Sequence, residues 1–200
     1  MRTINIYLFE ELSKKVQDKI IEHKLDTTWS DYWFPDPLLE TFKDTAKEYG
    51  FEDIDICYRG FYSQGDGLSF TGKINIDCFI DKIVKENPKL SKFRIKTLIE
   101  YTGTTFTLKR MIHRYCHENT VDTCITINST QRLTDRSYDY LHEIANYLEK
   151  YIESTRKELC RHFYASLEED YNAHMEEEMV REYLIDDEDN YYTEQGIHVI

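Results

Sequence analysis

The most distinctive polar string in the sequence is GFYSQGDG, at residues 60–67. Ser63, Gln64 and Asp66 could form a small polar cluster for a ligand, a partner or a reaction. The string is not a P-loop, because no Gly-Lys-Ser/Thr follows it and no helix is expected to begin there. The alternative is structural: the two glycines permit positive φ, and the aspartate can hydrogen-bond its own backbone in a tight connection.

The histidines and cysteines give weaker signals. HRYCH at residues 113–117 suggests zinc, but we expect it to end a strand, where residues four apart lie about 13 Å from each other. Cys116 and Cys160 each have a histidine close in sequence, which does not establish a nucleophilic pair in space. The five cysteines form no CxxC pair and are typical of reduced thiols in a cytosolic protein. We therefore expect no metal, no cofactor and no catalytic residue.

Negative charge is concentrated at the C-terminal end. Residues 151–200 hold 14 acids against 4 Lys/Arg, a net charge of −10 out of −13 for the whole chain. Such a region repels free nucleic acid, whose binding depends on positive charge. It is either a solvated face or a surface for a basic partner. The candidate partner-binding residues are Glu168, Glu169, Asp170, Glu176, Glu177, Glu178, Asp186 and Asp187.

A small basic band precedes this acidic region. Arg156, Lys157 and Arg161 lie within one predicted helix, and they could contact RNA with help from the aromatic residues Trp29 and Trp33. The alternative is an ordinary set of surface charges that balance nearby Asp and Glu.

Periodicity predicts the elements that carry these residues. Alternating residues predict a hairpin over 53–79 and a pair of strands over 105–114 and 120–128. A short strand is predicted at 2–8. Helical spacing predicts helices over about 14–25, 37–49, 80–86 and 90–101, and a long helix from Ser137 whose apolar stripe packs on the core, with a bend near residues 170–172.

Together these elements predict an α+β fold: a mostly antiparallel sheet, helices packed on one face, and a long C-terminal helix. We expect a core domain over residues 1–135 and a helical segment with an acidic tail over 136–200, packed on that core.

Three segments resemble a family of small phage-encoded, antitoxin-like proteins. They are the opening YLFEELSKKVQDKIIEHKL, the hairpin IDICYRGFYSQGDGLSFTGKI, and the closing LCRHFYASLEEDYNAHMEEEMVREYLIDDEDNYYTEQGI. The hairpin carries the GF-[WY]-SQGDG motif of that family, with Tyr62 at the Trp/Tyr position. The resemblance implies a protein of a mobile element that neutralises another macromolecule. It implies no catalytic residue and no cofactor.

We therefore expect a binding protein, antitoxin-like or an anti-CRISPR inhibitor of host defence, whose partner is a toxin or a CRISPR or other defence nuclease. An RNA-binding module that engages its partner through bound RNA is the alternative, and a small enzyme using the SQGDG loop is a third reading. No apolar run approaches the roughly 20 residues of a membrane span, and the N-terminus lacks the apolar run of a signal peptide. We expect the protein in the cytoplasm of a bacterial host cell.

Overall fold

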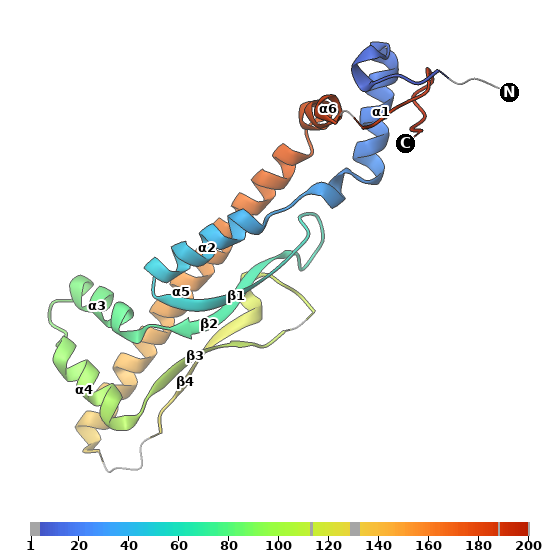
Figure 1. Ribbon diagram of the computed structural model, residues 1–200. Coiled ribbons are helices and arrows are strands. Elements are labelled where there is room, and N and C mark those ends of the chain that lie inside the picture. The colour runs from blue at the N-terminus through green and yellow to red at the C-terminus, as the bar shows by residue number, and fades with distance from the viewer. Residues whose placement is uncertain (1–4, 113, 129–132, 188, 200) are drawn as a thin grey trace. The chain divides into compact units, whose positions relative to one another are not determined.

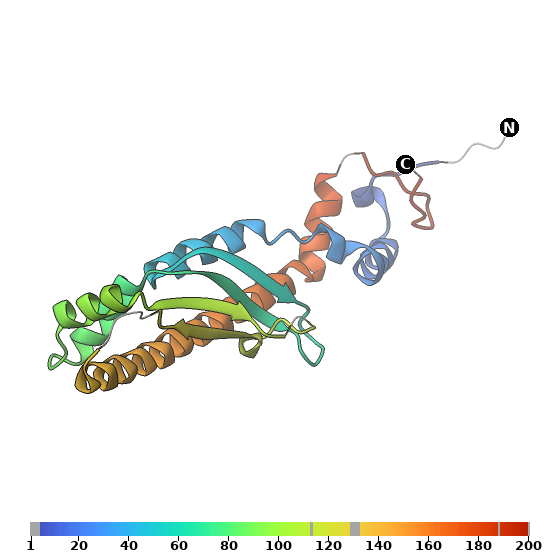
Figure 2. The ribbon, with the colours of Figure 1, turned by 90° about the horizontal axis from the view of Figure 1, so that it is seen from below.

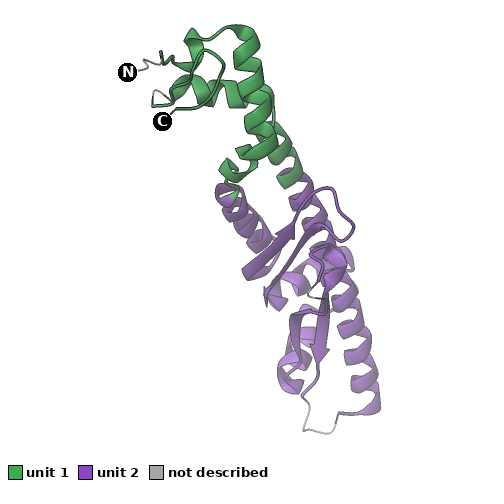
Figure 3. Cartoon of the chain, turned by 90° about the vertical axis from the view of Figure 1, so that its right-hand side faces the viewer, with its two compact units in different colours: residues 1–35, 167–200 green, residues 36–166 purple. Residues whose placement is uncertain are grey.

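The computed structural model describes residues 5–112, 114–128, 133–187 and 189–199. It contains two compact units, coloured separately in Figure 3. Unit 1 comprises residues 1–35 and 167–200, and unit 2 comprises residues 36–166. The boundary that we predicted at residue 135 coincides instead with the start of the long helix, whereas the units divide at 35/36 and 166/167.

The predicted α+β class and the long C-terminal helix are confirmed (Figure 1). The strands form two separate two-stranded antiparallel sheets. Unit 2 contains α2 (Asp36–Glu48), β1 (Phe51–Arg59), β2 (Gly67–Ile74), α3 (Ile76–Glu86), α4 (Lys92–Thr102), β3 (Thr105–Arg110), β4 (Val121–Thr126) and most of α5 (Asp135–His174). Unit 1 contains a 3-10 turn (Phe9–Glu11), α1 (Lys14–Thr27), a second 3-10 turn (Trp29–Tyr32), the end of α5, and α6 (Glu177–Asp186).

The hairpin of β1 and β2 confirms the clearest sequence prediction. The two strands pair antiparallel from Phe51 opposite Ile74 to Arg59 opposite Gly67, and the SQGDG segment connects them. The predicted extension of the second strand as far as residue 78 is wrong. The side chain of Asn75 accepts a hydrogen bond from the backbone N–H of Cys78 and caps α3, so the chain turns into a helix there.

The second pair of strands is shorter than predicted. β3 ends at Arg110, and Ile112, which we expected to face inward, is 41% exposed. Met111, Ile112 and Arg114, which we predicted as part of this strand, lie in the connection to β4. His113, part of the suggested zinc cluster, lies outside the described residues.

The core of unit 2 is aromatic. Phe42 of α2 stacks on Phe163 of α5 with ring centroids 4.3 Å apart, while Phe51 makes edge contacts with Phe70 and Phe79. The α5 stripe is buried as predicted, at Leu141, Ile144, Leu148, Ile152, Leu159 and Phe163. Figures 1 and 2 show α5 running along both small sheets, which explains why one side of this helix must be apolar.

Unit 1 has its own core, centred on Phe9, Trp29, Val180, Leu184 and Tyr192. The predicted N-terminal strand is wrong over its described residues. Only one isolated pairing forms there, between residues 7 and 192, and residues 2–4 lie outside the described part.

The predicted bend of the long helix lies a few residues later than expected, because α5 ends at His174 and α6 begins at Glu177. Among the described helices, none combines the length and the apolar character that spanning a membrane requires.

Candidate functional site

The eight predicted acidic residues all lie in unit 1, at the end of α5, within α6, and at the two caps of α6. We call them the acidic surface. Six of the eight are exposed, whereas Glu168 and Asp187 are half-buried. Within the described part of the chain, none of the eight is in an ion pair. Among the described residues of unit 1, one ion pair is present, which joins Arg181 of α6 to Asp18 of α1 at 2.9 Å.

Two members of the acidic surface have internal roles. Asp170 accepts a hydrogen bond from the indole N–H of Trp33 at 2.7 Å. Asp187 accepts a hydrogen bond from the side-chain amide of Asn190. These two carboxylates therefore help to hold unit 1 together. Of the other six, Glu168 is half-buried and five are exposed to solvent or a partner.

The carboxylates do not share one flat face. Successive residues of an α-helix are rotated by about 100°, so consecutive acids point in different directions around α6. Glu177 and Glu178 also lie in its first turn, where negative charge stabilises the helix through its dipole. This structural role accounts for part of the local charge, but not for Glu169 and Asp186, which lie elsewhere on α5 and α6.

The SQGDG loop is held by its own aspartate. The Asp66 carboxylate accepts hydrogen bonds from the backbone N–H groups of Tyr62, at 3.2 Å, and Ser63, at 2.7 Å. Gly65 has φ +95°, and an added Cβ would lie only 2.1 Å from the ring of Tyr115. These contacts favour the structural explanation of the motif, while Ser63 and Gln64 remain exposed.

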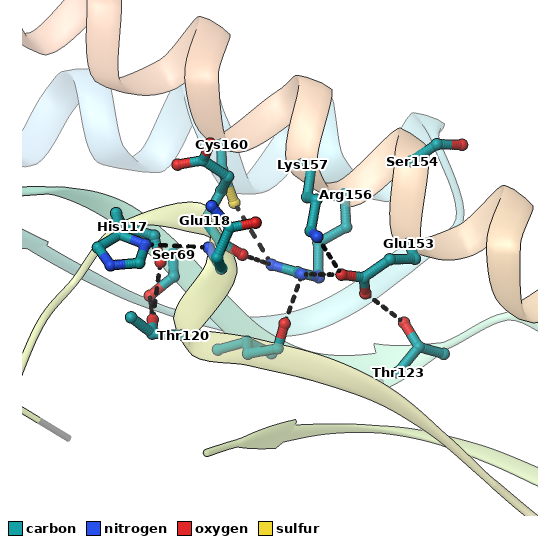
Figure 4. A network of polar contacts seen from close by, with 12 residues as sticks. Ser69, His117, Glu118, Thr120, Thr123, Glu153, Ser154, Arg156, Lys157 and Cys160 are labelled. Carbon is teal, nitrogen blue, oxygen red and sulfur yellow. Dashed lines mark hydrogen bonds and ion pairs between the residues drawn. The ribbon is translucent and has the colours of Figure 1, made fainter. Parts of the chain in front are cut away.

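Arg156, predicted as an RNA contact, is fully buried in unit 2, so that prediction is wrong. Its guanidinium donates to the backbone carbonyls of Glu118, at 2.9 Å, and Val121, and to the carboxylate of Glu153, at 2.9 Å (Figure 4). The signal was present in the sequence, because Arg156 lies four residues after Ile152 and three before Leu159, so the apolar stripe of α5 carries the arginine inward with it.

Glu153 is the centre of the same network. It pairs with Arg156, pairs with Lys157 at 3.0 Å, and accepts a hydrogen bond from the Thr123 hydroxyl at 3.1 Å. Burial favours a raised pKa for Glu153, but hydrogen bonds and charge from Lys157 and Arg156 outweigh it, and the pKa lies below its ordinary value of 4.5. Of the predicted basic band, Arg161 alone is exposed.

The aromatic residues proposed to help bind RNA have structural contacts instead. Trp29 is 3% exposed, stacks on the His174 ring with centroids 4.7 Å apart, and donates its indole N–H to the His174 carbonyl at 2.7 Å. A buried indole cannot stack on a base. Trp33 is half-buried, and its indole N–H donates a hydrogen bond to Asp170 of the acidic surface.

The cysteines are free thiols in the structure. Burial, followed by the neighbouring Cys57 thiol whose sulfur lies 2.9 Å away, raises the pKa of Cys116 to about 11. Burial likewise raises the pKa of Cys160 to about 11. Thiols with such values stay protonated and weakly nucleophilic near neutral pH. In the ranges the structure describes, no group of three or more His, Cys, Asp or Glu is arranged to hold a metal ion.

Sequence reasoning missed a cavity of about 590 Å³ in unit 1, between α1 and residues 190–198. Its α1 wall follows a helical spacing at residues 19, 20, 23, 24 and 27, which is visible in the sequence once the helix is recognised. The opposite wall comes from a segment about 170 residues away, and no local pattern links the two.

The fold and these surfaces define an α+β protein with a buried polar network in one unit and exposed acids in the other. Residues 33–177 match the family described as domain of unknown function DUF8835, so the chain belongs to that family. No curated protein and no solved structure matches the chain. The family match includes the SQGDG loop and the Arg156 network, but not the cavity at residues 19–28 and 190–198.

Proposed function

We propose that this protein acts by binding a macromolecular partner and neutralising it, as an antitoxin or an inhibitor of host defence. The partner class is a protein with a basic nucleic-acid-binding site, such as a toxin or a CRISPR nuclease. The observation that carries the proposal is the acidic surface, none of whose eight carboxylates forms an ion pair in the described structure. The resemblance to phage-encoded antitoxin-like proteins supports the same class.

Electrostatic complementarity supports this class of partner. Six exposed carboxylates gathered on α5 and α6 create a negative potential, which a cationic partner relieves and which speeds its encounter with the protein. A channel that normally binds nucleic acid offers the required density of Lys and Arg. The burial of Arg156 and Trp29 removes two of the residues on which RNA binding depended, so protein binding is the favoured reading.

The test begins with the tagged protein captured from bacterial cells that carry a toxin or a CRISPR nuclease. Inhibition of nucleic-acid cleavage by the captured enzyme is then measured with purified components. The test variant neutralises the five exposed acids of the acidic surface other than Asp170: Glu169→Gln, Glu176→Gln, Glu177→Gln, Glu178→Gln and Asp186→Asn.

A matched control removes the same charge from exposed, unpaired acids of unit 2: Asp44→Asn, Glu48→Gln, Glu100→Gln, Glu143→Gln and Glu158→Gln. We expect the test variant to lose inhibition by more than about tenfold and the control to change it much less. Equal effects of both variants, or recovery of RNA in place of a nucleic-acid-binding protein, would overturn the proposal.

A further inference from the structure

The cavity of unit 1 has the size of a small-molecule site. Its volume of about 590 Å³ lies within the usual range for such sites, about 300–1,000 Å³. One wall is the face of α1 that carries Lys19, His23, Lys24 and Thr27. Their spacing by one, three or four residues places these side chains together on one side of the helix.

The opposite wall is a C-terminal segment that backbone hydrogen bonds hold in place. Tyr192 is buried and exchanges backbone hydrogen bonds with Tyr7, both at 2.9 Å. A turn closes where Thr193 N–H donates to the Ile197 carbonyl at 2.9 Å. Gly196 has φ +84°, and an added Cβ would lie 2.9 Å from Val16 of α1, so the turn approaches the helix closely. The wall is therefore formed before any ligand arrives.

The lining is cationic in a strongly acidic protein. It includes two lysines and two histidines, Lys19, Lys24, His23 and His198, but no aspartate or glutamate. Neither lysine forms an ion pair with any described residue.

Lys24 is also positioned by two aromatic rings. Its ammonium lies 4.8 Å from the ring centroids of both Tyr32 and Tyr183. Cation–π contacts fix the side chain without neutralising its charge. The apolar part of the lining comes from Ile20 and Tyr192, which are buried.

We propose that this cavity binds a small organic anion, a molecule with a phosphate or carboxylate group and an apolar or aromatic body. Lys19, His23 and Lys24 receive the anionic group, and the body packs on Ile20 and Tyr192. A cation in a partly enclosed site attracts an anion more strongly than one in open water, because the local dielectric constant is lower. The proposal does not depend on the acidic surface or on a macromolecular partner.

Calorimetric titration of the full chain tests this with three probes. Adenosine 5′-monophosphate carries a phosphate, benzoate carries a carboxylate, and adenosine is the matched probe without an anionic group. We expect at least one anionic probe to bind with a submillimolar dissociation constant. If the phosphate is the recognised group, adenosine binds at least about tenfold more weakly than its monophosphate. If the carboxylate is recognised, benzoate binds and the nucleotide does not.

Two variants on α1 locate the site. Lys19→Gln removes an exposed cavity lysine, and Lys15→Gln removes an exposed lysine of the same helix outside the cavity. We expect about tenfold weaker binding for Lys19→Gln and less than about twofold change for Lys15→Gln, a distant charge that salt screens. Absence of saturable binding by both anionic probes at millimolar concentration overturns the proposal. Equal weakening by both variants also overturns it, because it shows a general charge effect.

Discussion

In unit 2 the guanidinium of Arg156 is fully buried and donates hydrogen bonds to two backbone carbonyls and a carboxylate. In unit 1, by contrast, six carboxylates of the acidic surface are exposed and form no ion pair in the described structure. The two regions differ in burial and in their charges, because the buried network pairs cations with a carboxylate while the acidic surface contains carboxylates alone. A buried charge costs several kcal/mol in lost hydration and is tolerated only with specific partners. An exposed charge keeps its hydration, so it remains available for an external partner.

This difference separates structural charge from functional charge. Removing one side chain of the buried network leaves its partners unsatisfied, so folding stability must fall. Removing the exposed carboxylates other than Asp170, which accepts a hydrogen bond from Trp33, should change stability little while binding changes strongly. The following tests address this comparison.

The largest expected effect is that of Arg156→Met. Loss of the guanidinium leaves the carbonyls of Glu118 and Val121 without that donor and the half-buried carboxylate of Glu153 without its closest cation. We expect the free energy of unfolding to fall by about 3–5 kcal/mol, as measured by urea denaturation. Arg161→Met, at an exposed position of the same helix, is the control and should change it by no more than about 0.5 kcal/mol. Similar losses for both would show that Arg156 is not specifically required.

Glu153→Gln should lower the free energy of unfolding by about 1–3 kcal/mol at pH 7, less than Arg156→Met. Because the pKa of Glu153 is lowered in the folded protein, its ionised form stabilises the fold above the ordinary value of 4.5. That contribution is lost as pH falls through the lowered pKa. Urea denaturation at several pH values should therefore show that the difference in free energy of unfolding between wild type and variant is largest at neutral pH and disappears in acid. A difference that grew in acid would contradict a lowered pKa for Glu153.

Neutralising the five acids of the test variant should change stability by less than about 1 kcal/mol. Repulsion among the carboxylates is relieved, while the favourable interaction of Glu177 and Glu178 with the α6 dipole is lost, and these effects oppose each other. Thermal unfolding at low and high salt is the measurement, and salt should reduce the difference in stability between wild type and the test variant. A loss comparable to that of Arg156→Met would show that the acidic surface is structural.

The last test concerns buried groups that are neutral, and it measures their chemical reactivity rather than the stability of the protein. Cys116 and Cys160 have pKa values raised to about 11, so iodoacetamide should modify them in native protein more slowly than the half-buried Cys78 and Cys124. Mass spectrometry of peptides after timed labelling gives the rates. Raising the pH toward 11 should speed labelling of the two buried thiols. Equal rates for all four at neutral pH would contradict their burial.

Sequence alone determined the local structure of this protein. Helical periodicity and two-residue alternation act over a few neighbours, so they located α1, α2, the β1–β2 hairpin and the long α5. They failed where the residues fit both a strand and a helix, as after Asn75. There the capping hydrogen bond of Asn75 starts α3, and the apolar spacing did not predict it. The acidic surface was also visible in sequence, because exposed charge needs no distant partner.

Only the tertiary structure decided which charges are buried and which surfaces meet. Arg156 lies on the apolar stripe in sequence, but it became structural because the carbonyls of residues 118 and 121 lie beside α5. The cavity of unit 1 needs α1 and residues 190–198, which are about 170 residues apart. Burial, hydration and cavity shape depend on contacts between such distant segments, and these contacts leave no trace in the local periodicity of either one.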